Sequence, residues 1–404
     1  MSAIASLVSL LLAAPLAAQA QSVPAQPATA QAAPAPSTPP APSPAAAQAG
    51  QACPSPTADQ TVKLGRRPFA AEPSGDNCYL YASVMGRDNG AVAVVVNEKG
   101  AFRLARMVDV AGGGGLSLSH DGSLLAVAAG NAIVLLDVAK LQTADQDPVV
   151  ATLPDTGHGA IYAQFSRDDT RLFISEERNT SIAVIDVAAA RSGNVDKAIV
   201  GRVPVGNAPV GLALSPDGAT LFATSQIKGI SDECKPEQEG GRAHAQGVVT
   251  AIDVARAAQD PQHAVAGEIR AGCNPVRVVM AANGRSLWIS QRGQDSVMGV
   301  DVSAVTTSVV PAKPLSLAVG RSPVGLAARA DGAQLWVANS DRFATVSGSL
   351  TVISPANAVD AKASGSLAVG VFPRDLRFMA DGRTLVVALY GDGALFLHPT
   401  GSAN

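Results

Sequence analysis

Short runs of alternating large and small apolar residues, each followed by a polar turn and a second apolar run, recur along most of this chain. The clearest copy, Pro209–Ser225, reads PVGLALSPDGATLFATS. Further copies begin at Pro73, Leu116, Ala163, Pro275, Pro323 and Pro373. Its Asp-Gly dipeptide is typical of tight turns, because glycine adopts positive φ without steric cost. Each copy therefore predicts two β-strands joined by a tight turn.

The copies are evenly spaced and contain two further apolar runs. The turn residue is Asp76, Asp121, Asp168, Asp217, Asn283, Asp331 or Asp381, at intervals of 45, 47, 49, 66, 48 and 50 residues. A third run ends near an acid, as at Val134–Asp137, and a fourth ends in Val-Gly, as at Val205-Gly206. Four short strands per repeat of this length are typical of a propeller blade, whereas a helical solenoid would need long amphipathic helices. Seven copies predict an all-β, seven-bladed β-propeller.

The two ends of the repeat region predict how the ring closes. Thr61–Gly65 resembles the strand that ends a blade, and the last copy stops at His398 after three strands. We therefore expect an N-terminal strand around Val62 to complete the last blade, which removes an exposed sheet edge. The propeller is predicted to span residues 58–401.

These repeats resemble the YVTN-repeat β-propeller family. The resemblance rests on the Ser215–Gly218 turn, the strand Leu335–Asn339 (LWVAN), the endings at Asp186 and Asp253, and the Val-Gly-x-x-Pro joints. It covers about residues 60–398. It implies an exported surface-layer or periplasmic protein, with a fold similar to gluconolactone-type lactonases and to the d1-haem propeller of nitrite reductases. Because the motifs are structural, they specify fold and not function.

The N-terminal region predicts export. Residues 1–20 contain an apolar run, Ile4–Leu16, followed by Ala18-Gln19-Ala20, as in a cleaved signal peptide, although no Lys or Arg precedes the run. The missing basic residue is explained if the true start lies upstream or if the signal is weak. The alternative to a signal peptide is a buried N-terminal helix. Residues 21–57 are dominated by Ala, Pro, Gln, Ser and Thr, a composition that predicts a disordered linker. With no later hydrophobic span, we expect a mature chain without a transmembrane segment, periplasmic or secreted.

The four cysteines, Cys53, Cys78, Cys234 and Cys273, predict two disulfides, since an even number in an exported chain favours pairing; four free thiols are the alternative. In a propeller, blade joints and the loops between second and third strands lie on one face, here called the top. Turns between first and second strands lie on the bottom. Cys234 and Cys273 belong to the top, and Cys53 and Cys78 to the bottom. The pairs Cys53–Cys78 and Cys234–Cys273 alone keep each bond on one face.

Candidate ligand-binding residues come from the innermost strands. Positions aligned with Gly211 are Gly115, Tyr162, Arg277, Gly325 and Asp375. We expect Tyr162, Arg277 and Asp375 to point into the top of the central channel, where the glycines leave room, with Arg374 and Arg377 close by. This set predicts a site for an anion or a polar ligand. The alternative is that Arg277 and Asp375 simply pair within a water-filled channel.

Two further top-face features complete the candidates. His158, at a blade joint, could bind ligand, or approach His244 and share a metal with Glu176 or Glu177. Histidine spacing along the chain does not indicate a metal, and we expect none. The insertion at 225–247 either shapes a binding surface or is a tolerated surface excursion.

Charge and motifs narrow the function. The net charge of −3 gives no basic surface for nucleic acid, and no G-x-S-x-G, P-loop or Rossmann motif occurs. We therefore expect an exported, monomeric, non-catalytic propeller without a cofactor, which binds a protein partner or a small polar ligand through its top face. The alternatives are a lactonase-type hydrolase acting at the same face and a redox accessory propeller with a non-covalent cofactor.

Overall fold

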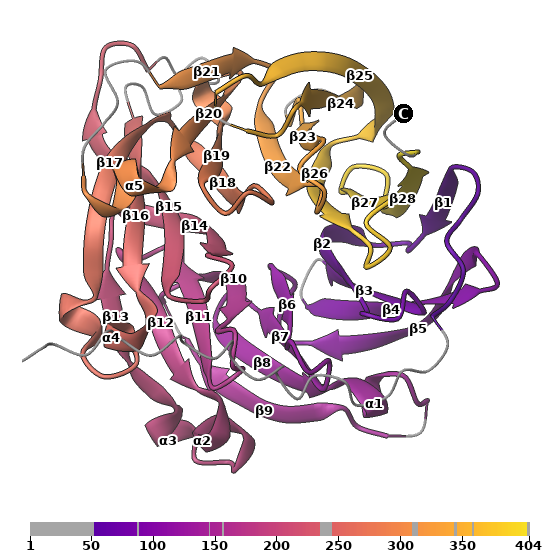
Figure 1. The fold of residues 1–404 in the computed structure, drawn as a ribbon. Coiled ribbons are helices and arrows are strands. Elements are labelled where there is room, and N and C mark those ends of the chain that lie inside the picture. Colours follow the sequence, from indigo (N-terminus) through magenta and orange to yellow (C-terminus); the bar gives the residue numbers. More distant parts are fainter. Residues whose placement is uncertain are drawn as a thin grey trace, which may run out of the picture. The chain divides into compact units, whose positions relative to one another are not determined.

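The computed structural model describes residues 52–86, 89–144, 146–155, 157–234, 245–308, 314–342, 346–357 and 359–401. They fall within one compact unit, Ala45–Asn404. In this part of the chain, seven four-stranded antiparallel sheets follow one another around a ring, as Figure 1 shows. The predicted seven-bladed β-propeller is confirmed.

Each blade runs from an innermost to an outermost strand, in sequence order for the first six blades. Blade 1 contains β2 (Arg67–Pro73), β3 (Tyr79–Met85), β4 (Gly90–Glu98) and β5 (Ala101–Val110). Blade 2 contains β6 (Leu116–Leu118), β7 (Leu124–Ala128), β8 (Ala132–Asp137) and β9 (Val149–Pro154). Blade 3 contains β10 (Ala160–Phe165), β11 (Arg171–Glu176), β12 (Ser181–Asp186) and β13 (Ile199–Pro204). Blade 4 contains β14 (Asn207–Leu214), β15 (Thr220–Ile230), β16 (Ala245–Asp253) and β17 (Val265–Cys273).

The remaining blades follow the same order until the ring closes. Blade 5 contains β18 (Pro275–Met280), β19 (Ser286–Gln291), β20 (Ser296–Asp301) and β21 (Leu315–Ala318). Blade 6 contains β22 (Pro323–Ala328), β23 (Leu335–Asn339), β24 (Ser347–Ser354) and β25 (Lys362–Val371). Blade 7 contains β26 (Pro373–Phe378), β27 (Thr384–Leu389), β28 (Ala394–Pro399) and β1 (Gln60–Lys63). The short helices are α1 (Val138–Leu141), α2 (Val187–Arg191), α3 (Val195–Ala198), α4 (Val254–Ala257), α5 (Val302–Thr306), η1 (Pro261–His263) and η2 (Arg292–Gln294).

The recurring acids of the sequence close turns and cap helices. In the tight turn of blade 2, Asp121 accepts hydrogen bonds from the Ser119 hydroxyl at 2.6 Å and from the Ser123 backbone at 2.8 Å. At the end of a third strand, Asp186 accepts from the Ala189 backbone at 2.8 Å and caps α2. Asp137, Asp253 and Asp301 cap α1, α4 and α5 in the same way. Such carboxylates satisfy backbone N–H groups that the turn or helix start leaves unpaired, so these acids are structural.

The ring closes as predicted. The N-terminal strand β1 pairs antiparallel with β28, and Val62 lies opposite Leu395. The side chains of Asp59 and His398 meet beside this pairing at 2.8 Å. Since β1 comes from the start of the propeller and β28 from its end, the pairing ties the two ends together and covers an edge of β28.

Both predicted disulfides are present, Cys53–Cys78 and Cys234–Cys273. The chain is already attached to blade 1 before β1, because Cys53 donates a backbone hydrogen bond to Asp76 at 2.8 Å and Pro54 accepts one from Asn97 at 2.9 Å. The last residues of the predicted 21–57 linker therefore contact the propeller. The predicted signal peptide at 1–20 and the linker up to residue 51 lie outside the described residues.

The hydrophobic core is divided among the interfaces between neighbouring blades. Leu135 of blade 2 packs in one cluster with Ile174 of blade 3, and Trp288 of blade 5 packs in another with Leu335 of blade 6. All four side chains are buried. Because each blade is covered on both faces by its neighbours, the strands are apolar on both faces, and the ring holds the innermost strands in fixed positions. No helix among the described residues is both long and apolar enough to cross a lipid bilayer.

Candidate functional site

Three of the predicted residues meet at the centre of the ring. Tyr162 lies on β10, Arg277 on β18 and Asp375 on β26, each an innermost strand. The guanidinium carbon of Arg277 lies 3.6 Å from the centroid of the Tyr162 ring, and its Nη2 donates to the Asp375 carboxylate. Only 5% of the Arg277 side chain and 1% of the Asp375 side chain are exposed. We call these three residues the central cluster.

A glycine makes room for the cluster, as the sequence predicted. A Cβ atom added at Gly115 of blade 2 would lie 2.1 Å from Cδ1 of Tyr162, closer than non-bonded atoms approach. The absence of a side chain there leaves room for the Tyr162 ring beside Gly115 and beneath Arg277. Burial raises the pKa of Tyr162, so its hydroxyl stays protonated at neutral pH.

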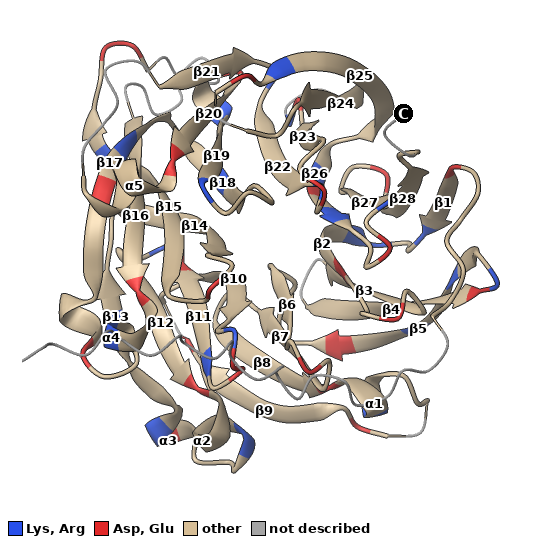
Figure 2. Cartoon of the chain, viewed as in Figure 1, with Lys and Arg blue, Asp and Glu red and all other residues tan. Residues whose placement is uncertain are grey.

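A pocket of about 100 Å³ opens from the cluster toward the top face, and we call it the top mouth. Its described lining consists of Ile161, Tyr162, Glu177, Val210, Gln226, Val276, Arg277, Arg292, Val324, Arg342, Phe372 and Arg374. The set contains four arginines and one carboxylate. Figure 2 shows blue segments on β18 and β26 near the centre of the ring. Because Asp375 neutralises Arg277, the remaining positive charge of the mouth lies on arginines closer to the top face.

Arg374 is an arginine of the top mouth that lies among three aromatic rings. Its guanidinium carbon lies 3.8 Å from the Phe69 ring centroid, 5.5 Å from that of Tyr390 and 5.8 Å from that of Phe372. Within the described residues it forms no ion pair, and its buried Nε has no hydrogen-bond partner. Burial lowers the pKa of Arg374, because taking a guanidinium out of water disfavours its charge. An incoming anion would supply the missing counter-charge.

Three top-mouth residues come from loops that follow second strands; the sequence analysis missed Arg292 and Arg342 and considered Glu177 only as a metal ligand. Glu177 follows β11, Arg292 follows β19 and Arg342 follows β23. Gln226 of β15 links two of them, because it accepts a hydrogen bond from Arg292 at 2.9 Å and donates one to Glu177 at 3.2 Å. Their common position, just after the second strand of a blade, is the sequence signal that could have identified them.

Arg377 lies in a different place from the one predicted. It lines a second opening, on the bottom face, with a volume of about 480 Å³. There its Nε donates to Glu72 at 3.1 Å, and its Nη1 lies 3.8 Å from the Asp375 carboxylate. Arg374 and Arg377 lie near opposite ends of β26. The Arg374 side chain therefore lines the top mouth, whereas the Arg377 side chain lines the bottom opening. Arg277, Asp375, Arg377 and Glu72 thus alternate in sign and largely neutralise one another.

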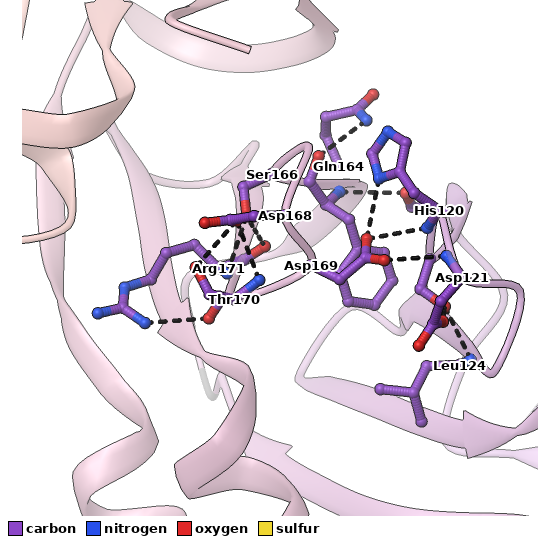
Figure 3. A network of polar contacts seen from close by, with 12 residues as sticks. His120, Asp121, Leu124, Gln164, Ser166, Asp168, Asp169, Thr170 and Arg171 are labelled. Atoms are coloured by element: carbon purple, nitrogen blue, oxygen red, sulfur yellow. Dashed lines mark hydrogen bonds and ion pairs between the residues drawn. The ribbon is translucent and has the colours of Figure 1, made fainter. Parts of the chain in front are cut away.

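The bottom opening is bordered by a network that joins two blades, drawn in Figure 3. The Asp169 carboxylate of blade 3 accepts backbone hydrogen bonds from His120 at 2.9 Å and Asp121 at 3.0 Å, both in the turn of blade 2. It also contacts His120 Nδ1 at 2.9 Å, and this hydrogen bond raises the pKa of His120. Gln164 lies beside His120 in the same opening. The network fixes the two turns and leaves the centre of the bottom opening accessible.

His158 is on the top face but does not join the central cluster. Its Nδ1 lies 2.7 Å from Asn179 Nδ2 and 4.0 Å from the Glu176 carboxylate, and the residue is not part of the described lining of the top mouth. His244, its proposed neighbour, lies outside the described residues. Within the described part of the chain, no group of three or more His, Cys, Asp and Glu residues is placed to hold a metal ion.

Comparison with known proteins supports the fold. No protein-family model and no curated protein match this sequence. Among solved structures, hydrazine synthase from Kuenenia stuttgartiensis is similar with a TM-score of 0.64 and 16% identity, over 83% of this chain and 96% of the other. A chain of the mitotic checkpoint complex is similar with a TM-score of 0.60 and 15% identity, over 86% and 95%. These likenesses, together with the seven blades, define the chain as a β-propeller protein; its resemblance to the YVTN-repeat family stays a prediction.

Proposed function

We propose that this propeller is an exported, non-catalytic binding protein whose top mouth holds a small ligand through a carboxylate, sulfate or phosphate group. The observation that carries the proposal is the Arg374 guanidinium, which is packed against three aromatic rings and has no acid as a partner in the described part of the chain. Export is supported by the two disulfides, since such bonds persist mainly in oxidising compartments.

The shape and charge of the mouth favour a small anionic group over a neutral one. A volume of about 100 Å³ is large enough for one carboxylate, sulfate or phosphate group and far too small for a folded domain. A guanidinium presents a planar fork of donors that matches two oxygens of one anion. Arg292 and Arg342 add positive charge at the rim, while Glu177 offers an acceptor to a donor group elsewhere on the ligand.

Direct binding measurements test this function. Isothermal titration of the purified mature chain with sulfate and with succinate should show binding, and Arg374→Met should weaken it by about 10- to 100-fold, since hydrogen bonds to charged groups contribute about 1.5–3 kcal/mol. Arg285→Met is the matched control, because the Arg285 side chain is 80% exposed and reaches Asp301 only at 3.5 Å. Equal affinity in the Arg374→Met variant, or no binding of either probe to the native chain, would contradict the proposal.

The hydrolase alternative is tested separately. Purified protein is incubated with simple lactones, with and without a chelator, and ring opening is followed by the acid that it releases. We expect no hydrolysis above the uncatalysed rate. Turnover that disappears with the chelator and with Arg374→Met would replace the binding function with a catalytic one at the same mouth.

A further inference from the structure

Two buried carboxyl groups meet beside the top mouth, in the joint between blades 2 and 3. Asp155 directly follows β9, and Glu176 is the last residue of β11; neither side chain is exposed. Both contact one cation, Arg202 of β13. Its Nε lies 2.9 Å from Glu176 Oε1, and its Nη2 lies 3.4 Å from Asp155 Oδ1.

The hydrogen-bond donors around the pair are unequally divided. Glu176 accepts from both Arg202 and the Ser181 hydroxyl. Oδ2 of Asp155 is buried and has no partner among the described residues. Two carboxylates facing one guanidinium leave a buried negative charge uncompensated, which is costly. A proton on Asp155, shared with Glu176, would remove the extra charge and would give the unpartnered oxygen a hydrogen bond to make.

The electrostatics agree with this placement of the proton. The pKa of Asp155 is raised to about 7: burial is the largest cause, the hydrogen bond to Glu176 and the charge of Glu176 act in the same direction, and Arg202 opposes them. The other titratable groups around the pair are His158 of the same joint, 4.0 Å from Glu176, and Glu177 and Arg178 of the following turn. Carboxyl pairs that share one proton are a known result of such crowding.

The pair holds together the two segments that place Glu177 at the top mouth. Glu177 donates its backbone N–H to Gly159 at 2.9 Å, and Arg178 donates to His158 at 2.9 Å, so the turn after β11 is bonded to the joint that begins at Asp155. The Glu177 side chain then accepts from Gln226, and Gln226 in turn accepts from Arg292. The Glu177 turn therefore helps to hold an arginine of the top mouth in place.

We propose that Asp155 and Glu176 share one proton that keeps this joint closed, and that loss of the proton to solvent loosens the Glu177 turn and weakens anion binding at the top mouth. The second half of this proposal rests on the proposed function; the first half does not. Deprotonation leaves two like charges on one arginine, and their repulsion acts directly on the contact of residues 155 and 157–159 with the turn that carries Glu177.

The sign of the stability effect follows from the direction of the shift. The folded chain holds the proton up to a pH of about 7, whereas an unfolded Asp releases it near 3.8. Stability from this pair is therefore full below the unfolded value, falls as pH rises between the two values, and is constant above the higher one. Asp155→Asn keeps a donor toward Glu176 at every pH and removes this dependence.

Unfolding measurements test the shared proton without any ligand. Melting temperatures of the native chain and of Asp155→Asn are compared from about pH 5 to about pH 8. We expect the difference, variant minus native, to increase across this range. Asp109→Asn is the control, since the Asp109 side chain is 68% exposed and its charged neighbour is Arg66 and not a histidine. Glu176→Gln repeats the test if Asp155→Asn fails to fold, and His158→Gln should leave the effect in place. A difference that does not change with pH in either acid variant would overturn the shared proton.

Binding measurements then test the coupling to the mouth. Sulfate is the probe, because its charge is constant in this range. With full coupling, the affinity of the native chain falls by up to about tenfold per pH unit above about pH 7, while that of Asp155→Asn does not. An affinity that varies equally with pH in both proteins would overturn the coupling. Failure of sulfate to bind at all would contradict the proposed function, whereas the unfolding data would still decide whether the proton is shared.

Discussion

The Arg277 guanidinium lies over the ring of Tyr162, with 3.6 Å between the guanidinium carbon and the ring centroid, although the two residues belong to blades 5 and 3. The contact crosses the central channel, where Arg277 also pairs with Asp375 of blade 7. One side chain thereby connects three blades at the axis of the ring. Because Arg277 lines both the top mouth and the bottom opening, the central cluster lies between the two.

Removing one partner of the buried pair should therefore destabilise the whole ring. We expect Arg277→Met to lower the free energy of unfolding by about 3–5 kcal/mol, because the buried Asp375 would lose its closest cation and keep only Arg377, 3.8 Å away. The double variant Arg277→Met, Asp375→Leu should recover much of this loss. Urea unfolding followed by circular dichroism measures both. Arg285→Met, at a side chain 80% exposed, should change stability by less than about 1 kcal/mol. A single variant as stable as the control would show that the pair contributes little.

The close approach of Gly115 to Tyr162 gives a second test. Gly115→Ala places a methyl group 2.1 Å from the present position of Tyr162 Cδ1, so the ring must move and Arg277 loses its support. We expect a loss of about 1–3 kcal/mol in stability, as for other overpacked cores. Gly75→Ala is the control, because no atom lies within 4 Å of a Cβ at Gly75. Equal thermal stability of the two alanine variants would contradict the steric argument.

The turn network of Figure 3 predicts a pH effect on the bottom face. The hydrogen bond to Asp169 raises the pKa of His120 above its ordinary value of 6.5. The stability it adds is full below the unfolded pKa and is lost as pH rises through the folded pKa. The melting temperature of the native chain, relative to His120→Gln, should therefore decrease as pH rises through this interval. His263→Gln is the control, because the His263 side chain is 76% exposed. The melting temperature of this variant, relative to His120→Gln, should decrease with pH as that of the native chain does. A constant difference between native chain and His120→Gln would mean that the pair does not stabilise the turns.

The sequence predicted those parts of the molecule that repeat. The turn aspartates such as Asp121 recur in nearly every blade, so seven blades could be counted, and blade topology assigned each cysteine to a face. The central cluster was found because Tyr162, Arg277 and Asp375 interrupt a column of glycines. Arg292 and Arg342 were missed, and Glu177 was considered only as a metal ligand, because all three lie in top loops that differ in length and composition from blade to blade. Nor does a sequence show that Arg374 and Arg377 reach opposite openings, since this depends on the direction of each side chain along β26.

The Cys53–Cys78 disulfide should stabilise ring closure more than its loop length suggests. The two disulfides close segments of similar separation, 25 and 39 residues, so loss of either should cost about 2–4 kcal/mol by chain entropy alone. Cys53 lies just before β1, however, and the Ser55 hydroxyl donates to Asp381 in the last blade. We therefore expect paired serine substitutions at Cys53 and Cys78 to speed amide exchange in β1 and β28.

Paired serine substitutions at Cys234 and Cys273 are the control, and they should lower stability without opening the pairing of β1 with β28. Hydrogen exchange read by mass spectrometry distinguishes the two, and equal protection of β1 in both variants would show that the strand pairing closes the ring without help from the disulfide.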